Sequence, residues 1–126
     1  MNPERRVTLR TIPQPSDLNV NGNIFGGWVL SQMDLAGADV AARLAGGNVA
    51  TVAIEGMTFH CPIEVGDVIS IYTEITKIGR TSITVELDVF AERGVARETH
   101  KVTEGIYIFV AIDDRGRPRP VTQEET

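Results

Sequence analysis

The chain has 126 residues, of which 42% are hydrophobic and 23% are charged, and its formal net charge is −5. This length fits one domain with a hydrophobic core, so we expect a single domain over residues 1–126. The negative charge argues against nucleic acid as the main partner. The single cysteine, Cys61, excludes an internal disulfide framework and indicates a cytoplasmic protein, and the charged start of the chain is unlike a signal peptide.

Sequence motifs for metals and common cofactors are missing. His60 and His100 are far apart and have no cluster of cysteines near them, so no zinc-binding spacing is present. The paired glycines occur in FGG and AGG, which match neither a P-loop nor a dinucleotide-binding fingerprint. We therefore expect no metal site and no cofactor.

The first quarter of the chain predicts a tail, a short strand and a loop. We expect residues 1–6 to form a loose tail. The stretch from Val7 to Ile12 predicts an edge strand, because prolines follow it closely. Residues 13–22 are rich in Pro, Asn and Gly, which is typical of a loop. A long polar loop that leads into a helix is a common place for functional residues.

Residues 28–45 form an apolar segment that predicts a helix buried on most sides. The pair Gly26-Gly27 precedes this segment and the pair Gly46-Gly47 follows it, as expected for the two ends of a helix. Two aspartates and an arginine within it argue against a membrane span. One sheet face would not cover such an apolar helix, so we expect a second subunit to cover part of it.

Asp34 stands out among the polar residues of this helix. At about 100° per residue, Gln32, Asp39 and Arg43 fall on one stripe, and Asp34 lies roughly opposite among small apolar residues. A carboxylate on the apolar side is costly unless it is hydrogen-bonded, paired or protonated. A catalytic role and a structural role, as a cap or an ion-pair partner, are equally good interpretations of this position.

The start of the helix is a second candidate site. A helix N-terminus presents free N–H groups and a partial positive charge. Gly26 and Gly27 would let a ligand approach this backbone closely, which suits the binding of a carbonyl or an oxyanion. A flexible entry to the helix explains the two glycines equally well.

Only strands follow the helix. The predicted strands cover residues 49–59, 68–78, 82–92 and 98–112. Three long alternating strands with short links predict an antiparallel meander. In the last strand, the alternation places Val102, Ile106, Ile108, Val110 and Ile112 on one side. The expected fold class is α+β, with one antiparallel sheet and one long helix, and the Pro-rich segment 117–126 is expected to be a loose tail.

Several motifs resemble the YciA-type acyl-coenzyme A thioesterases. They are NGNIFGGWVLSQMDLAG, VATVAIEGMTF, PIEVGD, KIGRTS and a last strand that ends in FVAID. The resemblance covers residues 17–118, and the first motif is the most specific. It implies the hotdog fold, in which five or six antiparallel strands surround a central helix. It also implies hydrolysis of acyl-CoA, and homodimers with shared active sites that assemble into hexamers as trimers of dimers.

The resemblance also implies roles for individual residues. The essential acid would be Asp34, which would activate a water as general base or attack the thioester directly. Asn23 would reach it from the other subunit, and a backbone N–H of Gly27 or Trp28 would polarise the thioester carbonyl. The expected catalytic residues are Asp34, Asn23 and Gly27, and the expected substrate-binding residues are Phe25, Gly26, Trp28, Met57, Arg80, Thr81 and Ser82.

Coenzyme A carries phosphates, so an acidic protein must bind it through a local basic patch. The candidates are Arg80 in the GRTS turn and the tail arginines Arg115, Arg117 and Arg119. The resemblance favours the GRTS turn, and simple solvation is the preferred interpretation of the tail arginines.

Two other functions fit the same resemblance. A hotdog dehydratase usually pairs a histidine with an acid, and the predicted helix contains no histidine. A non-catalytic acyl-CoA sensor would control a DNA-binding domain, and the chain has no helix-turn-helix segment. The presence of both Asn23 and Asp34 favours catalysis over either alternative.

Overall fold

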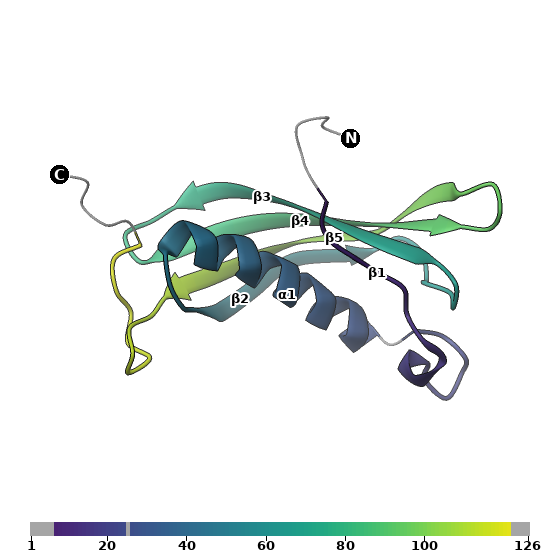
Figure 1. Ribbon diagram of the computed structural model, residues 1–126, viewed down its shortest axis with the longest axis horizontal. Coiled ribbons are helices and arrows are strands. Elements are labelled where there is room, and N and C mark those ends of the chain that lie inside the picture. Colours follow the sequence, from purple (N-terminus) through teal and green to yellow (C-terminus); the bar gives the residue numbers. More distant parts are fainter. Residues whose placement is uncertain (1–6, 25, 122–126) are drawn as a thin grey trace.

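One antiparallel sheet and one long helix make up the computed structural model, which describes residues 7–24 and 26–121. The elements are α1 (Gly26–Ala45), β1 (Val7–Thr11), β2 (Val49–Phe59), β3 (Val68–Ile78), β4 (Ser82–Arg93) and β5 (Glu98–Ala111), with a one-turn 3-10 helix at Pro15–Asp17. The strand order is β1-β3-β4-β5-β2, and α1 lies along one face of the curved sheet (Figure 1). The predicted α+β class and antiparallel meander are confirmed, and each predicted strand ends within one residue of the observed one.

The core lies between α1 and the inner face of the central strands. The inward residues of β4 are all completely buried: Ile83, Val85, Leu87, Val89 and Ala91. On the helix, Met33, Ala36 and Ala41 are buried against them, whereas Asp39 and Arg43 are exposed. The polar stripe predicted from the helical period is therefore confirmed for these two residues.

Gly37 lets the helix lie close to the sheet. A Cβ atom at this position would lie 2.8 Å from Cζ of Phe109. The ring of Phe109 stacks on Tyr107, with 6.1 Å between the ring centroids, and both side chains are fully buried. Because the ring is held on all sides, only glycine fits here without displacing the core.

The helix ends where the glycine signal predicts. Gly46 has a φ of 70°, a left-handed conformation that glycine adopts without strain, and its N–H donates to the carbonyl of Ala42 at 2.8 Å. The chain then turns directly into β2.

The last strand differs from the prediction in which residues it buries. Ile106, Ile108 and Val110 share a face as predicted, but they are only half-buried and lie on the side away from α1. Val102 does not belong to that set. Val102 has no partner on β4, because Thr103 is opposite Val89 and Lys101 is opposite the next residue, Phe90. The side chain of Val102 is buried. This β-bulge shifts the alternation by one residue, which a simple two-residue period cannot anticipate.

The prediction of a loose tail from residue 117 is wrong for residues 117–121. Pro118 forms a β-bridge with Ile112, and the side chain of Val121 is 1% exposed. Residues 1–6 and 122–126, also predicted to be loose, lie outside the described residues.

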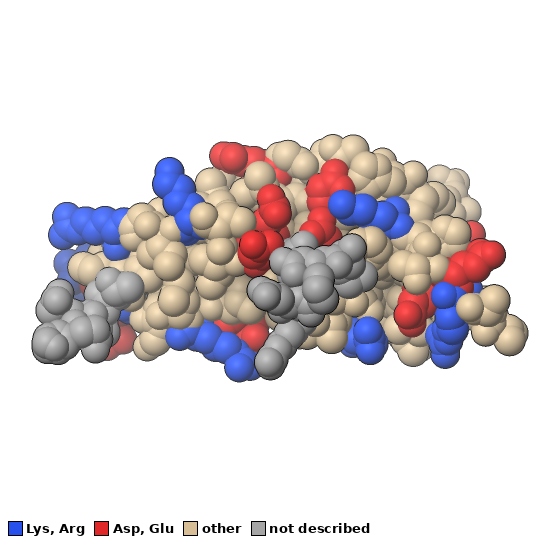
Figure 2. All heavy atoms as spheres, turned by 90° about the horizontal axis from the view of Figure 1, so that it is seen from above, with Lys and Arg blue, Asp and Glu red and all other residues tan. Residues whose placement is uncertain are grey.

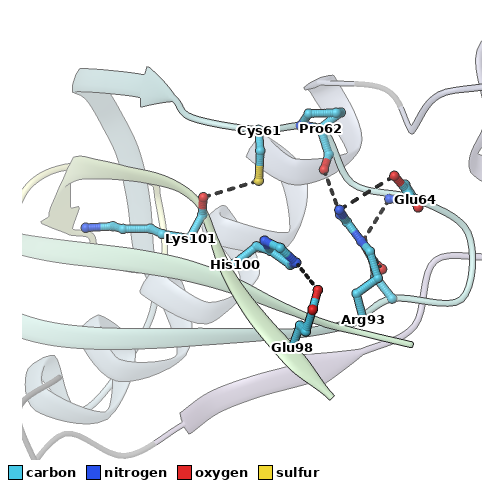
Figure 3. A network of polar contacts seen from close by, with 8 residues as sticks. Cys61, Pro62, Glu64, Arg93, Glu98, His100 and Lys101 are labelled. Atoms are coloured by element: carbon cyan, nitrogen blue, oxygen red, sulfur yellow. Dashed lines mark hydrogen bonds and ion pairs between the residues drawn. The ribbon is translucent and has the colours of Figure 1, made fainter. Parts of the chain in front are cut away.

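An ion pair between Asp67 and Arg93 joins the turn between β2 and β3 to the end of β4. Figure 3 shows Arg93 beside Pro62 and Glu64 of this turn. Asp67 is 1% exposed and accepts hydrogen bonds from Nε and Nη2 of Arg93 at 2.9 and 2.8 Å, and from the N–H of Glu64 at 2.9 Å. Nη2 of Arg93 also donates to the carbonyl of Pro62 at 3.0 Å. Burial raises the pKa of Asp67, but the hydrogen bonds from Arg93 and Glu64 outweigh burial and hold that pKa below its ordinary value.

Candidate active site

Asp34 lies in the middle of α1, on the side of the helix that faces β2. Its side chain is half-buried, and its Oδ1 accepts a hydrogen bond from the hydroxyl of Thr51 at 2.6 Å. This bond satisfies one oxygen of the carboxylate in a partly desolvated position. The structure therefore supplies the partner that a carboxylate on this side of the helix requires.

Tyr107, on the inner face of β5, is hydrogen-bonded to the same turn of the helix. Its side chain is fully buried, and its hydroxyl donates to the carbonyl of Leu30 at 2.8 Å. In an α-helix this carbonyl is also the acceptor for the N–H of the residue four positions later, which is Asp34. Burial raises the pKa of Tyr107, and the neighbouring Asp34 raises it further, so the phenol stays neutral and keeps its proton for this bond.

Neither Thr51 nor Tyr107 was among the residues predicted for the site. Thr51 is the hydroxyl residue in the apolar run VATVAI, which is a weak signal for a polar contact. Tyr107 follows Gly105 and precedes Phe109 on the inner face of β5, which marks it as a core residue but not as a partner of the helix. Their hydrogen bonds join residues that are far apart in the sequence.

The helix N-terminus is open in the single chain. Cβ atoms added to Gly26 and Gly27 would meet no heavy atom within 4 Å, so packing within this chain does not require glycine at either position. Trp28 is half-buried against the core. The first N–H groups of an α-helix have no acceptor within the helix, so this end can donate to a ligand. Phe25, the remaining predicted residue of this turn, lies outside the described residues.

Asn23 lies in the loop before the helix and is exposed. Its N–H donates to Oδ1 of Asn19 at 3.1 Å, and its carbonyl accepts the N–H of Asn19 at 2.6 Å. Within the described ranges, no hydrogen bond joins Asn23 to Asp34. Gly27 and Asp34 are seven residues apart on the helix, which corresponds to about 10 Å along its axis. One chain therefore does not bring the predicted catalytic residues together.

Met57 lies at an irregular part of β2 and packs onto the inner face of the sheet. The space beside Gly105 is filled by the sulfur of Met57, and the methyl group of Met33 lies next to it. Because Met33 directly precedes Asp34, the structure places Met57 beside the helix turn that contains the candidate acid. Its position suits the lining of an acyl-binding pocket as well as ordinary core packing.

The GRTS turn connects β3 to β4 at the end of the molecule where α1 ends (Figure 1). The N–H of Gly79 donates to the carbonyl of Ser82 at 2.8 Å, which closes the turn, and the carbonyl of Thr81 accepts the N–H of Ala111 at 2.9 Å. Arg80 is exposed at its tip. The predicted phosphate-binding residues thus lie near the C-terminal end of α1, at the opposite end of the helix from its N-terminus.

The tail arginines differ from one another. Arg117 is paired with Asp113, with 3.4 Å between Nε and Oδ2, and the side chain of Arg117 is 65% exposed whereas that of Asp113 is 36% exposed. Arg119 is not simply solvated, because its guanidinium donates to the carbonyls of Ala45 at 2.9 Å and Ile112 at 3.2 Å. For Arg119 the preferred interpretation from sequence is therefore wrong.

His60 and Cys61 are hydrogen-bonded within the chain, whereas Nε2 of His100 is buried and makes no hydrogen bond in the described part of the chain. His60 is hydrogen-bonded to Glu104 at 2.8 Å, and the thiol of Cys61 donates to the carbonyl of Lys101 at 3.3 Å. His100 lies 3.4 Å from Glu98 (Figure 3). Among residues 7–24 and 26–121, no group of three or more His, Cys, Asp or Glu side chains could hold a metal ion. In the same part of the chain, no helix has both the length and the apolar character needed to cross a bilayer.

Comparisons with known proteins identify the family. The thioesterase superfamily matches residues 21–97. The chain is 44% identical over 122 residues to the acyl-CoA thioester hydrolase YciA of Salmonella typhimurium, which covers 94% of this chain and 92% of that protein.

Solved structures agree with this assignment. A hexameric thioesterase from Yersinia pestis is 43% identical with a TM-score of 0.90, over 97% of this chain and 99% of that one. A hexameric hotdog-fold thioesterase of Campylobacter jejuni is 38% identical with a TM-score of 0.87, over 92% of this chain and 90% of that one. The chain therefore belongs to the YciA-type acyl-CoA thioester hydrolases, within the thioesterase superfamily, and has the hotdog fold.

Proposed function

We propose that this protein hydrolyses acyl-coenzyme A thioesters to free acid and CoA, with Asp34 as the catalytic carboxylate. The observation that supports this role best is the position of Asp34, half-buried and held by the hydroxyl of Thr51 on the side of the helix that faces the sheet edge. A carboxylate kept in such a place is available to act on a water or a thioester that binds beside it. No cofactor takes part in the proposed reaction.

The helix N-terminus polarises the thioester in this proposal. The carbonyl oxygen accepts a hydrogen bond from the N–H of Gly27 or Trp28, and the open space over the glycine pair leaves room for it. In one route, Asp34 takes a proton from water as the water oxygen attacks the carbonyl carbon. In the other, the carboxylate attacks the carbonyl carbon and water then hydrolyses the mixed anhydride. In both routes the carbon–sulfur bond breaks and CoA leaves as the thiolate.

The proposed active site is shared between two subunits. Because about 10 Å of helix separate Gly27 from Asp34, one chain does not place both at the same carbonyl. Large apolar side chains beside Asp34 and along the free edge of the sheet are exposed, among them Leu35 and Val52 at 57% and Ile54 at 45%. A second subunit seated on this surface would cover them and bring its own Asn23 toward Asp34.

The solved relatives named above are hexameric, and we propose that this protein likewise assembles as a trimer of dimers. A cytoplasmic location is part of the same proposal, since its single thiol suits a reducing compartment.

The GRTS turn binds the CoA phosphates in this proposal, through the guanidinium of Arg80 and the hydroxyls of Thr81 and Ser82. Several Lys and Arg side chains lie at the left end of the face in Figure 2, and others lie along its lower edge and toward the right, while many of the Asp and Glu side chains lie over the middle. The exposed cation of Arg80 suits a polyanionic nucleotide on a protein whose net charge is negative.

The test is the release of free thiol from a panel of short to long acyl-CoA thioesters, corrected for the thiol of Cys61. Asp34→Asn should lower kcat by about 10²–10⁴-fold, because it removes the general base or nucleophile while keeping the shape of the side chain. Asp39→Asn is the matched control, since Asp39 lies on the same helix but is exposed. This control should retain full activity.

An unchanged kcat in Asp34→Asn would remove Asp34 from the mechanism. Binding of acyl-CoA to the intact protein without thiol release from any ester would replace the hydrolase with a non-catalytic acyl-CoA sensor.

A further inference from the structure

The segment after β5, residues 113–121, is folded into a defined structure that we call the C-terminal strap. It begins with a closed turn around Asp113, whose Oδ1 accepts the N–H groups of Arg115 and Arg117, both at 2.9 Å. The N–H of Asp113 donates to the carbonyl of Arg117 at 2.8 Å. This turn reverses the chain direction and sends the strap back along the end of the sheet.

The strap then holds the backbone of the GRTS turn. The N–H of Arg119 donates to the carbonyl of Ala111 at 2.9 Å, and the N–H of Val121 donates to the carbonyl of Arg80 at 2.8 Å. The side chain of Val121 is buried, which anchors this end of the strap. Since β5 already holds the carbonyl of Thr81 through Ala111, the turn is fixed from two neighbouring segments.

The side chain of Arg119 ties the strap to the end of α1. Its Nη2 donates to the carbonyl of Ala45 at 2.9 Å, its Nε to Ile112 at 3.2 Å and its Nη1 to Pro120 at 3.1 Å. Gly47 leaves space for the guanidinium, because a Cβ atom there would lie 2.7 Å from Nη2. A cation is favourable beside the free carbonyls of a helix C-terminus. All three nitrogens of this guanidinium thus donate to backbone carbonyls of the protein itself.

We propose that Arg119 and Val121 are positioning residues for recognition of the CoA nucleotide. The strap holds the backbone of Arg80, Thr81 and Ser82 in one conformation, so that the turn is already ordered when the phosphates bind. A turn that is ordered beforehand loses less conformational freedom on binding, which strengthens affinity without any contact to the ligand. This inference rests on the proposed role of the GRTS turn in phosphate binding and extends it to a segment that need not touch CoA.

The experiment compares two substrates with the same acyl group, acyl-CoA and the acyl thioester of N-acetylcysteamine, which lacks the nucleotide. Arg119→Ala should raise KM for acyl-CoA about fivefold to tenfold, as expected for the loss of hydrogen bonds of ordinary strength. The kcat for acyl-CoA and the kcat/KM for the short thioester should stay unchanged, because neither depends on the nucleotide. A variant that was merely misfolded would lose activity toward both substrates.

Further variants distinguish a positioning role from direct contact. Arg119→Lys keeps the charge but not the planar fork of donors, so it should resemble Arg119→Ala rather than wild type. Val121→Ala, at the other anchor of the strap, should raise the same KM. Arg43→Ala is the matched control, because it removes a positive charge from an exposed position near the end of α1, and it should leave KM unchanged.

A double-mutant cycle tests whether Arg119 acts through Arg80. If it does, Arg80→Ala combined with Arg119→Ala should raise KM little more than Arg80→Ala alone. If the increases in KM of the two single variants multiply in the double variant, Arg119 has an independent role and the inference is overturned. The inference is also overturned if Arg119→Lys has the KM of the wild type, or if Arg119→Ala loses equal activity toward both substrates.

If the wild type hydrolyses no thioester, the affinity for CoA is measured instead by calorimetric titration. Weaker binding by Arg119→Ala would support the strap, and equal binding would overturn it.

Discussion

At the scale of single residues, the candidate site depends on how one carboxylate is held. Oδ1 of Asp34 is engaged by Thr51, and the backbone of its helix turn is engaged by Tyr107 through Leu30. The second oxygen of the carboxylate has a defined direction as a result, which is what a general base or a nucleophile needs. Thr51 and Tyr107 therefore orient the acid in the proposed mechanism, while Asp34 itself meets the substrate.

Replacing Thr51 by valine tests this arrangement, since valine has nearly the same shape but no hydroxyl. We expect kcat to fall about tenfold, because a hydrogen bond to a charged group that is worth about 1.4 kcal/mol would no longer hold the carboxylate. Thr51→Ser keeps the donor and should retain most of the activity. Steady-state kinetics on one acyl-CoA, with thermal unfolding as a check of the fold, measure the effect. Equal rates for Thr51→Val and wild type would show that the bond is not needed for catalysis.

At the scale of secondary-structure elements, the ion pair of Asp67 and Arg93 joins the turn before β3 to the end of β4. The hydrogen bonds from Arg93 and Glu64 keep the pKa of Asp67 below its ordinary value of 3.8, despite the opposing effect of burial. A carboxyl group whose pKa is lower in the folded protein stabilises the fold above that ordinary value. This stabilisation is lost as the pH falls through the lowered pKa of the folded state.

Asp67→Asn should therefore lower the free energy of unfolding at pH 7 by about 2 kcal/mol, the usual scale for hydrogen bonds to a charged group. The difference from wild type should begin to narrow below about pH 4, where Asp67 of the unfolded chain takes up a proton, and should disappear as the pH falls through the lowered pKa of Asp67 in the folded protein. Urea unfolding at pH 7 and at pH 3 measures both effects, and Asp114→Asn in an exposed turn is the control. A difference that stays constant with pH would mean that charge is not the source of the stabilisation.

At the scale of the whole molecule, a single chain leaves part of its apolar surface uncovered. Strand β2 lies at one edge of the sheet, and Val52 and Ile54 on it are exposed, as is Leu35 on α1. An exposed edge strand with large apolar side chains favours association with another chain. The candidate acid lies beside this surface, so assembly and catalysis are expected to depend on each other.

Ile54→Glu should break the proposed dimer, because it places a charge in the middle of the apolar contact. We expect a smaller molar mass by light scattering together with loss of thiol release, although Asp34 is still present in the folded monomer. Val95→Glu, at the exposed tip of the turn between β4 and β5, is the control and should change neither property. An active monomer would exclude a shared site.

The sequence by itself determined the elements and the side of the helix on which Asp34 lies. Both follow from the periods of helix and strand, which relate residues only a few positions apart. The tertiary structure decided which distant residues form hydrogen bonds with the helix. Thr51 is 17 positions from Asp34, Tyr107 is 77 positions from Leu30, and Arg119 is 74 positions from Ala45. Such contacts depend on strand order and on a β-bulge that reassigns one face of β5, and local periodicity contains no information about either.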